Sequence, residues 1–166
     1  MKKEFLLGLS LLLLFANTLS AKDLSRRLGI GFAQAQGDVV STPAISIRFH
    51  QNKIVSYSGQ VAFNTRQNAL LLGGKFFRNL LAEDYLNFFM SSGVFLLNKQ
   101  DASSGSNVSK TGFHFEAMVG AEFFLPHLDN LSFMIETGLG LTLFGSEVTF
   151  RTMGTSFVTA GIHYYL

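Results

Sequence analysis

The stretch Val158–Leu166 reads V-T-A-G-I-H-Y-Y-L and alternates strictly between two kinds of side chain. The apolar members share one parity: Val158, Ala160, Ile162, Tyr164 and Leu166. The other parity holds Thr159, Gly161, His163 and Tyr165. Because successive side chains of a β-strand point to opposite faces, the stretch predicts a strand with one apolar and one mostly polar face.

The same period-two alternation recurs along the chain and predicts eight strands joined by short connections. The expected strands are Leu28–Gln36, Ala44–His50, Ile54–Asn64, Ala69–Arg78, Tyr85–Leu97, Thr111–Phe124, Leu131–Phe144 and Thr155–Leu166. We expect connections at Asn98–Lys110, which is rich in Ser, Asn, Asp and Gly, and at Gly145–Gly154. The fold class is therefore all-β, an eight-stranded antiparallel up-and-down barrel.

The first residues predict export rather than structure. Met1-Lys2-Lys3 is basic, Phe5 to Phe15 is apolar, and Leu19-Ser20-Ala21 is a small-residue cleavage site. The apolar run is shorter than the roughly 20 residues of a membrane-spanning helix, so residues 1–21 are expected to be a signal peptide. Residues 22–166 then form a single barrel domain.

Composition limits the chemistry of that domain. The chain has no cysteine, which excludes disulfides and thiolate metal sites, and its net charge is only +2. Such a small basic excess gives no basis for nucleic-acid binding. We expect no cofactor.

The polarity of the two rows distinguishes a membrane barrel from a soluble lipocalin-like one. A soluble barrel exposes its charged row to water, whereas a membrane barrel exposes its apolar row to lipid. Here the polar row is dominated by small residues and glycines with few charges, as a narrow eight-stranded interior requires. We expect no charged residue on the apolar row. The pattern favours a closed transmembrane barrel, in which no backbone edge is left unpaired in hydrocarbon.

Two stretches carry a family resemblance: the final strand, with an aromatic Tyr164 third from its end, and the predicted hairpin from Glu122 to Gly140. In these the chain resembles small bacterial outer-membrane β-barrel proteins such as the OmpA transmembrane domain and OmpX. The resemblance implies a monomer in the outer membrane, in contact with its lipid and lipopolysaccharide. It also implies an assembly signal, read by the barrel-assembly machinery, formed by Val158, Ala160, Ile162, Tyr164 and Leu166.

The charged and histidine residues of the polar row are the candidate functional residues. They are Arg48, Lys75, His114, Glu116, Glu122, Glu136 and His163, with His50 on the same row. Glu122 and Glu136 flank one turn, so we expect Arg48 or Lys75 to reach them, because unpaired charge in a narrow interior is costly. Such residues form either a filled polar core or an ion path.

Three functions are consistent with this pattern. The first is a structural or interaction protein with a mostly filled polar interior, and the second is a small porin-like channel for ions or small solutes. The third is a lipid A-modifying enzyme, but the chain has no Ser two residues after a His, so we predict no catalytic residue. His114 and Glu116 could begin a metal site but lack an evident third ligand, so we predict no metal.

Overall fold

The structure is a computed structural model that describes residues 24–37, 40–66, 68–101, 108–152 and 158–166. The predicted signal peptide, residues 1–21, lies outside these ranges. Within them, no helix is long and apolar enough to cross a membrane. The strands are β1 (Leu28–Gly37), β2 (Val40–His50), β3 (Val55–Asn64), β4 (Ala69–Ala82), β5 (Leu86–Asp101), β6 (Val108–Leu125), β7 (Leu128–Phe144), β8 (Glu147–Thr152) and β9 (Thr159–Tyr165).

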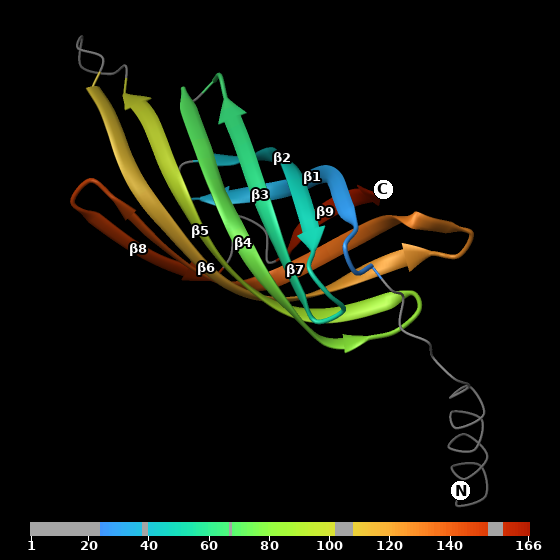
Figure 1. The fold of residues 1–166 in the computed structure, drawn as a ribbon. Coiled ribbons are helices and arrows are strands. Elements are labelled where there is room, and N and C mark those ends of the chain that lie inside the picture. The colour runs from blue at the N-terminus through green and yellow to red at the C-terminus, as the bar shows by residue number, and fades with distance from the viewer. Residues whose placement is uncertain (1–23, 38–39, 67, 102–107, 153–157) are drawn as a thin grey trace, which may run out of the picture.

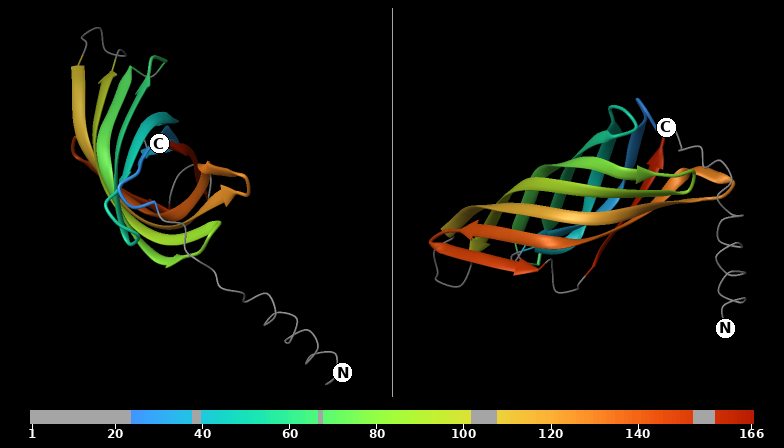
Figure 2. Two further views of the ribbon diagram at one scale, coloured as in Figure 1. Left: turned by 45° about the vertical axis from the view of Figure 1, so that its right-hand side comes forward. Right: turned by 90° about the horizontal axis from the view of Figure 1, so that it is seen from below.

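The strands close into an antiparallel barrel (Figures 1 and 2). Each strand from β1 to β7 pairs with the next, and β9 pairs with both β7 and β1, from Gly29 opposite Tyr165 to Ala33 opposite Gly161. β8 pairs with the other half of β7, so β8 and β9 together form the eighth strand of the barrel. The predicted eight-stranded antiparallel barrel is confirmed.

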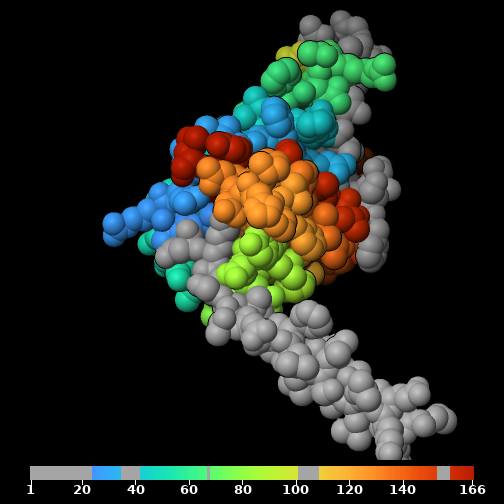
Figure 3. All heavy atoms as spheres, turned by 90° about the vertical axis from the view of Figure 1, so that its right-hand side faces the viewer, coloured from blue at the N-terminus to red at the C-terminus, as the bar shows by residue number. Residues whose placement is uncertain are grey.

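The barrel has two ends, a proximal end and a distal end. The proximal end carries the start of β1, the end of β9 and the connections 51–54, 83–85 and 126–127. Figure 3 shows this end, with the β6–β7 hairpin (orange) at its centre and the β4–β5 connection (yellow-green) below it. The distal end carries the ends of β1, β3, β5 and β7 and the starts of β2, β4, β6 and β8.

The predicted connection Gly145–Gly154 is wrong over most of its length. β7 turns into β8 through only Gly145 and Ser146, and Gly145 has the positive φ of 63° that a tight hairpin needs. Glu147–Thr152 is a strand with outward-facing Val148 and Phe150. The alternation in Glu147–Thr152 is only six residues long, and glycines flank it at 145 and 154. The sequence pattern therefore indicates a connection there rather than a strand. The predicted start of the last strand, Thr155, lies outside the described residues.

The predicted connection Asn98–Lys110 is also too long. β5 continues to Asp101 and β6 begins at Val108, with Asn98 opposite Thr111. The Asn98 side chain donates hydrogen bonds to the hydroxyls of Ser109 (3.0 Å) and Thr111 (3.1 Å). Polar side chains on a paired backbone leave no hydrophobic alternation, so the strand was hidden in the sequence.

The outer surface of the barrel is apolar, the reverse of a soluble protein. Large hydrophobic side chains are exposed on every strand of the barrel, among them Phe32, Phe63, Leu72 and Phe113, each at least half exposed. The expectation that this row has no charged residue is wrong, because Arg78 lies on it and is exposed. The predicted strand ended at Arg78, whereas β4 continues to Ala82 with exposed Leu80 and Leu81.

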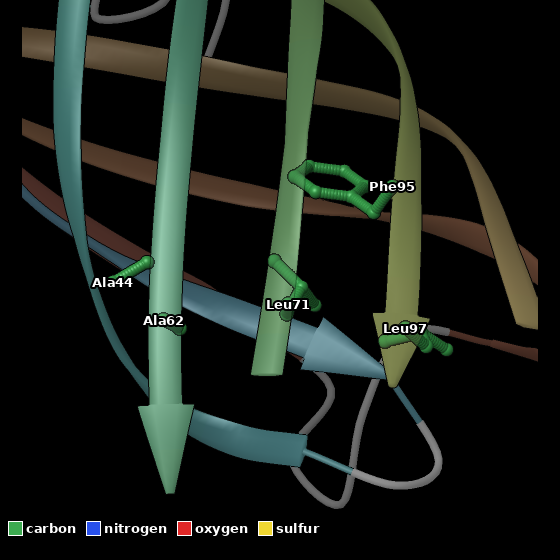
Figure 4. Close-up of a cluster of buried hydrophobic side chains, with 5 residues drawn as sticks. All are labelled: Ala44, Ala62, Leu71, Phe95 and Leu97. Atoms are coloured by element: carbon green, nitrogen blue, oxygen red, sulfur yellow. The ribbon is translucent and has the colours of Figure 1, made fainter. Parts of the chain in front are cut away.

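The interior is divided into an apolar distal part and a polar remainder. Ala44, Ala62, Leu71, Phe95 and Leu97 form a buried cluster in which β2 meets β3, β4 and β5 (Figure 4). Leu71 and Leu97 are completely buried. The prediction of a mostly polar interior therefore fails in the distal part, because the polar parity of β4 and β5 changes to Leu and Phe there.

Candidate functional site: the buried polar network of the barrel

Alternation along the strands brings the predicted polar residues into the interior of the barrel. All seven are between 0% and 7% exposed: Arg48, Lys75, His114, Glu116, Glu122, Glu136 and His163. They form two charged clusters, one near the proximal end and one in the middle of the barrel.

The proximal cluster is an ion pair between Arg48 on β2 and Glu122 on β6. Arg48 Nη1 lies 3.3 Å from Glu122 Oε2, and both side chains are fully buried. The other carboxylate oxygen of Glu122 accepts hydrogen bonds from Tyr165 Oη (2.6 Å) and Ser132 Oγ (2.8 Å), while Arg48 Nε donates to Ser56 Oγ (3.2 Å). A buried ion pair needs such additional hydrogen bonds, because burial removes both charges from water.

The middle cluster places one cation between two carboxylates. Lys75 Nζ on β4 lies 2.7 Å from Glu116 Oε1 and 2.8 Å from Glu136 Oε2. Ser91 Oγ donates to Glu136 Oε1 (2.9 Å), and His114 Nε2 is 3.8 Å from Glu116 Oε2. The sequence predicts that Arg48 or Lys75 reaches Glu122 and Glu136; in the structure each cation contacts one of them.

Aromatic side chains separate the two clusters, and the sequence analysis missed them. The Phe77 ring centroid lies 4.1 Å from Arg48 Cζ and 5.5 Å from Lys75 Nζ, so both cations contact this ring. Phe89 packs edge-on against Phe77 at 5.4 Å between ring centroids. Phe77 and Phe89 lie at sequence positions that alternate with the outward-facing residues of their strands. This parity could have predicted that both side chains point into the barrel.

The proximal end is covered by the residues before β1. Leu24 is 2% exposed and packs with Phe124 and Tyr165. This turn is held by hydrogen bonds from Arg26 N to the His50 carbonyl (2.7 Å) and from Arg27 Nη1 to Asn130 Oδ1 (2.9 Å). No alternation marks Leu24, so only the folded chain identifies it as a barrel residue.

One pair in the interior has the composition of a nucleophile and its base. His163 Nε2 lies 2.9 Å from Ser46 Oγ, across two strands. Both side chains are 1% exposed, and His163 Nδ1 has no hydrogen-bond partner. The pair therefore lacks both an acid that would orient the imidazole and access for a substrate. Among the described residues no three His, Asp or Glu side chains are placed to hold a metal ion.

The residues of the predicted assembly signal all share the outward-facing parity of the C-terminal segment 158–166. Val158, Ile162, Tyr164 and Leu166 are exposed to between 36% and 68%, and Ala160 is exposed beside them. The strand thus presents a continuous apolar row outward.

A solved structure has the same architecture as this chain. The chain is similar to the crystal structure of the N-terminal β-barrel domain of Pseudomonas aeruginosa OprF, with a TM-score of 0.63. The match covers 87% of this chain and 100% of the OprF domain at 12% sequence identity.

The chain has the fold of that barrel domain. No protein-family model matches the sequence, and no curated protein is detectably similar to it. At 12% identity the likeness to OprF concerns the fold, and the activity has to be argued from the residues of this chain.

Proposed function

We propose that this protein is an integral β-barrel of the bacterial outer membrane with a structural or interaction role and an interior closed to solutes. The observation that carries the proposal is the inverted polarity of the barrel: hydrophobic side chains cover its outside, and its ion pairs are sealed inside. Soluble proteins rarely expose contiguous apolar patches beyond a few hundred Å². A barrel whose outside is covered with apolar side chains is explained by a hydrocarbon environment around it.

The proposed orientation puts the proximal end in the periplasm and the distal end outside the cell. It follows from the predicted signal peptide and from the layout of bacterial barrels, whose turns are short on the periplasmic side. The last strand, with Tyr164 and Leu166 on its outer row, would be the part that the barrel-assembly machinery reads. The mature protein would be a monomer surrounded by phospholipid and lipopolysaccharide.

Three successive layers of side chains support a closed interior. Leu24 covers the proximal end, the two ion-pair clusters fill the middle, and the cluster around Leu71 and Leu97 fills the distal part. A water-filled path would hydrate the charged groups, yet Arg48 and Glu122 are 0% exposed. We therefore favour a structural or interaction role over a porin-like channel and over a lipid-modifying enzyme.

Membrane fractionation and planar-bilayer recording test this proposal. The native protein should be extracted from the outer membrane only by detergent and should migrate differently in gels with and without boiling. Inserted into a planar bilayer, it should produce no regular conductance steps. Protein found in the soluble periplasm would refute the membrane placement, and regular steps from the wild-type barrel would favour the channel.

A further inference from the structure

Arg78 is a charged side chain on the apolar outer surface, at the level where β3 begins near the proximal end. It lies on the outer face of β4, directly opposite Val55 on β3 and Met90 on β5, and Leu80 and Leu81 continue the apolar row beyond it. Its guanidinium is exposed and makes no hydrogen bond or ion pair with another described residue. An arginine on the lipid face of a barrel costs up to about 2–4 kcal/mol near the midplane and little near the interfaces, so the Arg78 guanidinium is stabilised where it reaches a polar lipid group.

A groove begins beside Arg78 on the same outer face. Its walls are the exposed side chains of Tyr57, Phe76, Val94 and Phe115, and Gly74 and Ser92 lie between them. The remaining lining residues are Ser58, Lys75, Gly93 and Glu116, of which Ser58, Lys75 and Glu116 are buried. The groove holds about 620 Å³ and is mostly apolar. Phe76 is two residues before Arg78 in β4, roughly 7 Å along the strand.

Gly59, beside the groove, is not needed for packing of the barrel wall. A Cβ on Gly59, the cross-strand neighbour of Gly74, would meet no atom of the protein within 4 Å. A Cβ on Gly74 would meet only the Ser58 carbonyl oxygen, at 3.0 Å. By contrast, a Cβ on Gly31 at the β1–β9 seam would lie 1.8 Å from the Ile162 carbonyl oxygen. The open space at Gly59 faces outward, where lipid lies in the proposed function.

We propose that Arg78 and this groove bind one phospholipid molecule, with its phosphate on the guanidinium and an acyl chain between the packed Tyr57–Phe76 pair on one side and Val94 on the other. The inference rests on the membrane placement proposed above. Guanidinium binds phosphate oxygens through paired, charge-assisted hydrogen bonds, and the apolar walls match a hydrocarbon chain.

The depths of Arg78 and of the groove in the membrane match the positions of the phosphate and the acyl chain of a phospholipid. β4 ends at Ala82, four residues beyond Arg78, so Arg78 lies roughly 10 Å from the proximal end for a strand tilted about 40°. Its long side chain spans part of that distance toward the interface. The groove lies on the distal side of Arg78, deeper in the membrane. In the proposed orientation this is the periplasmic leaflet, which contains phospholipid rather than lipopolysaccharide.

Native mass spectrometry of the full-length protein in detergent, titrated with phosphatidylglycerol, tests the proposal. We expect the wild type to retain one phosphatidylglycerol and Arg78→Leu to bind it about tenfold more weakly or worse, as expected for loss of hydrogen bonds to a charged group. Ser92→Leu, which fills the groove and keeps the cation, should also weaken binding. Arg66→Leu removes an exposed cation at the distal end, and Ala160→Leu enlarges a small outward residue on β9; both should bind like the wild type.

The outcomes separate this inference from the proposed function. Equal binding by wild type and Arg78→Leu, equal weakening by Arg66→Leu, or no effect of Ser92→Leu would overturn the lipid site while leaving the barrel in the membrane. Displacement of the lipid by millimolar inorganic phosphate would show that the phosphate alone is recognised and would also overturn it. Each variant is first checked for the heat-dependent gel shift, and Arg78→Gln replaces Arg78→Leu if the latter does not fold. A protein absent from membranes instead refutes the proposed function.

Discussion

The ion pair between Arg48 and Glu122 allows a quantitative test of the closed interior. Both side chains are fully buried, with Nη1 and Oε2 3.3 Å apart. Removing one partner of a buried pair leaves an uncompensated charge, so Glu122→Gln and Arg48→Met should each lower the free energy of unfolding by about 3–5 kcal/mol. The double variant buries no unpaired charge and should lose no more than about 2 kcal/mol, because replacing both partners of a buried pair is often neutral.

These values predict a coupling free energy of about 4 kcal/mol or more between the two residues. It is measured by urea unfolding of the protein in lipid vesicles, followed by far-ultraviolet circular dichroism because the chain has no tryptophan. Water reaching the pair would screen it and reduce its coupling to about 1 kcal/mol or less, the range of exposed pairs. A coupling free energy that small would refute the filled interior and would favour the hypothesis of an ion path through the barrel.

Two further variants test the packing of the barrel. Leu97→Ala deletes a completely buried side chain of the distal cluster and should lower the free energy of unfolding by about 2–5 kcal/mol; a loss below about 1 kcal/mol would mean that this end is open to solvent. Gly31→Ala forces a Cβ to within 1.8 Å of the Ile162 carbonyl oxygen and should destabilise closure of β1 on β9 by about 1–3 kcal/mol or more. Gly59→Ala is its control and should unfold at the wild-type urea concentration, since its Cβ meets nothing; equal effects of the two alanines would show that the seam is not tightly packed.

The sequence predicts strands where the alternation is long and rich in apolar residues, and it misses strands where the alternation is short or mostly polar. Ile45 and Ile47 against Ser46 and Arg48 mark β2 plainly. Glu147–Thr152 and the ends of β5 and β6 were assigned to connections, because backbone pairing there is accompanied by few apolar side chains. Arg78 stands at the end of the predicted strand, and its parity with Leu72 and Phe76 is what places it on the apolar row.

The candidate site was predictable in its members but not in its contacts. Parity alone assigned Glu116, Glu122 and Glu136 to the polar row. It could not show that Arg48 lies against Glu122 whereas Lys75 lies between the other two, because these partners come from strands far apart in sequence. Phe77 and Leu71 also share the polar parity, and only the folded barrel shows that they divide the interior into separate layers.

By itself, the sequence determined that the protein is an antiparallel barrel with an apolar exterior, since a period of two assigns each residue to one face regardless of its neighbours. The tertiary structure decided how the barrel is filled and which residues lie together on its outer surface. Closure brings β2, β4, β6 and β9 together around one interior, where contacts depend on register and strand tilt. It also sets Arg78 beside a groove built from β3 to β6, a juxtaposition that no local pattern encodes.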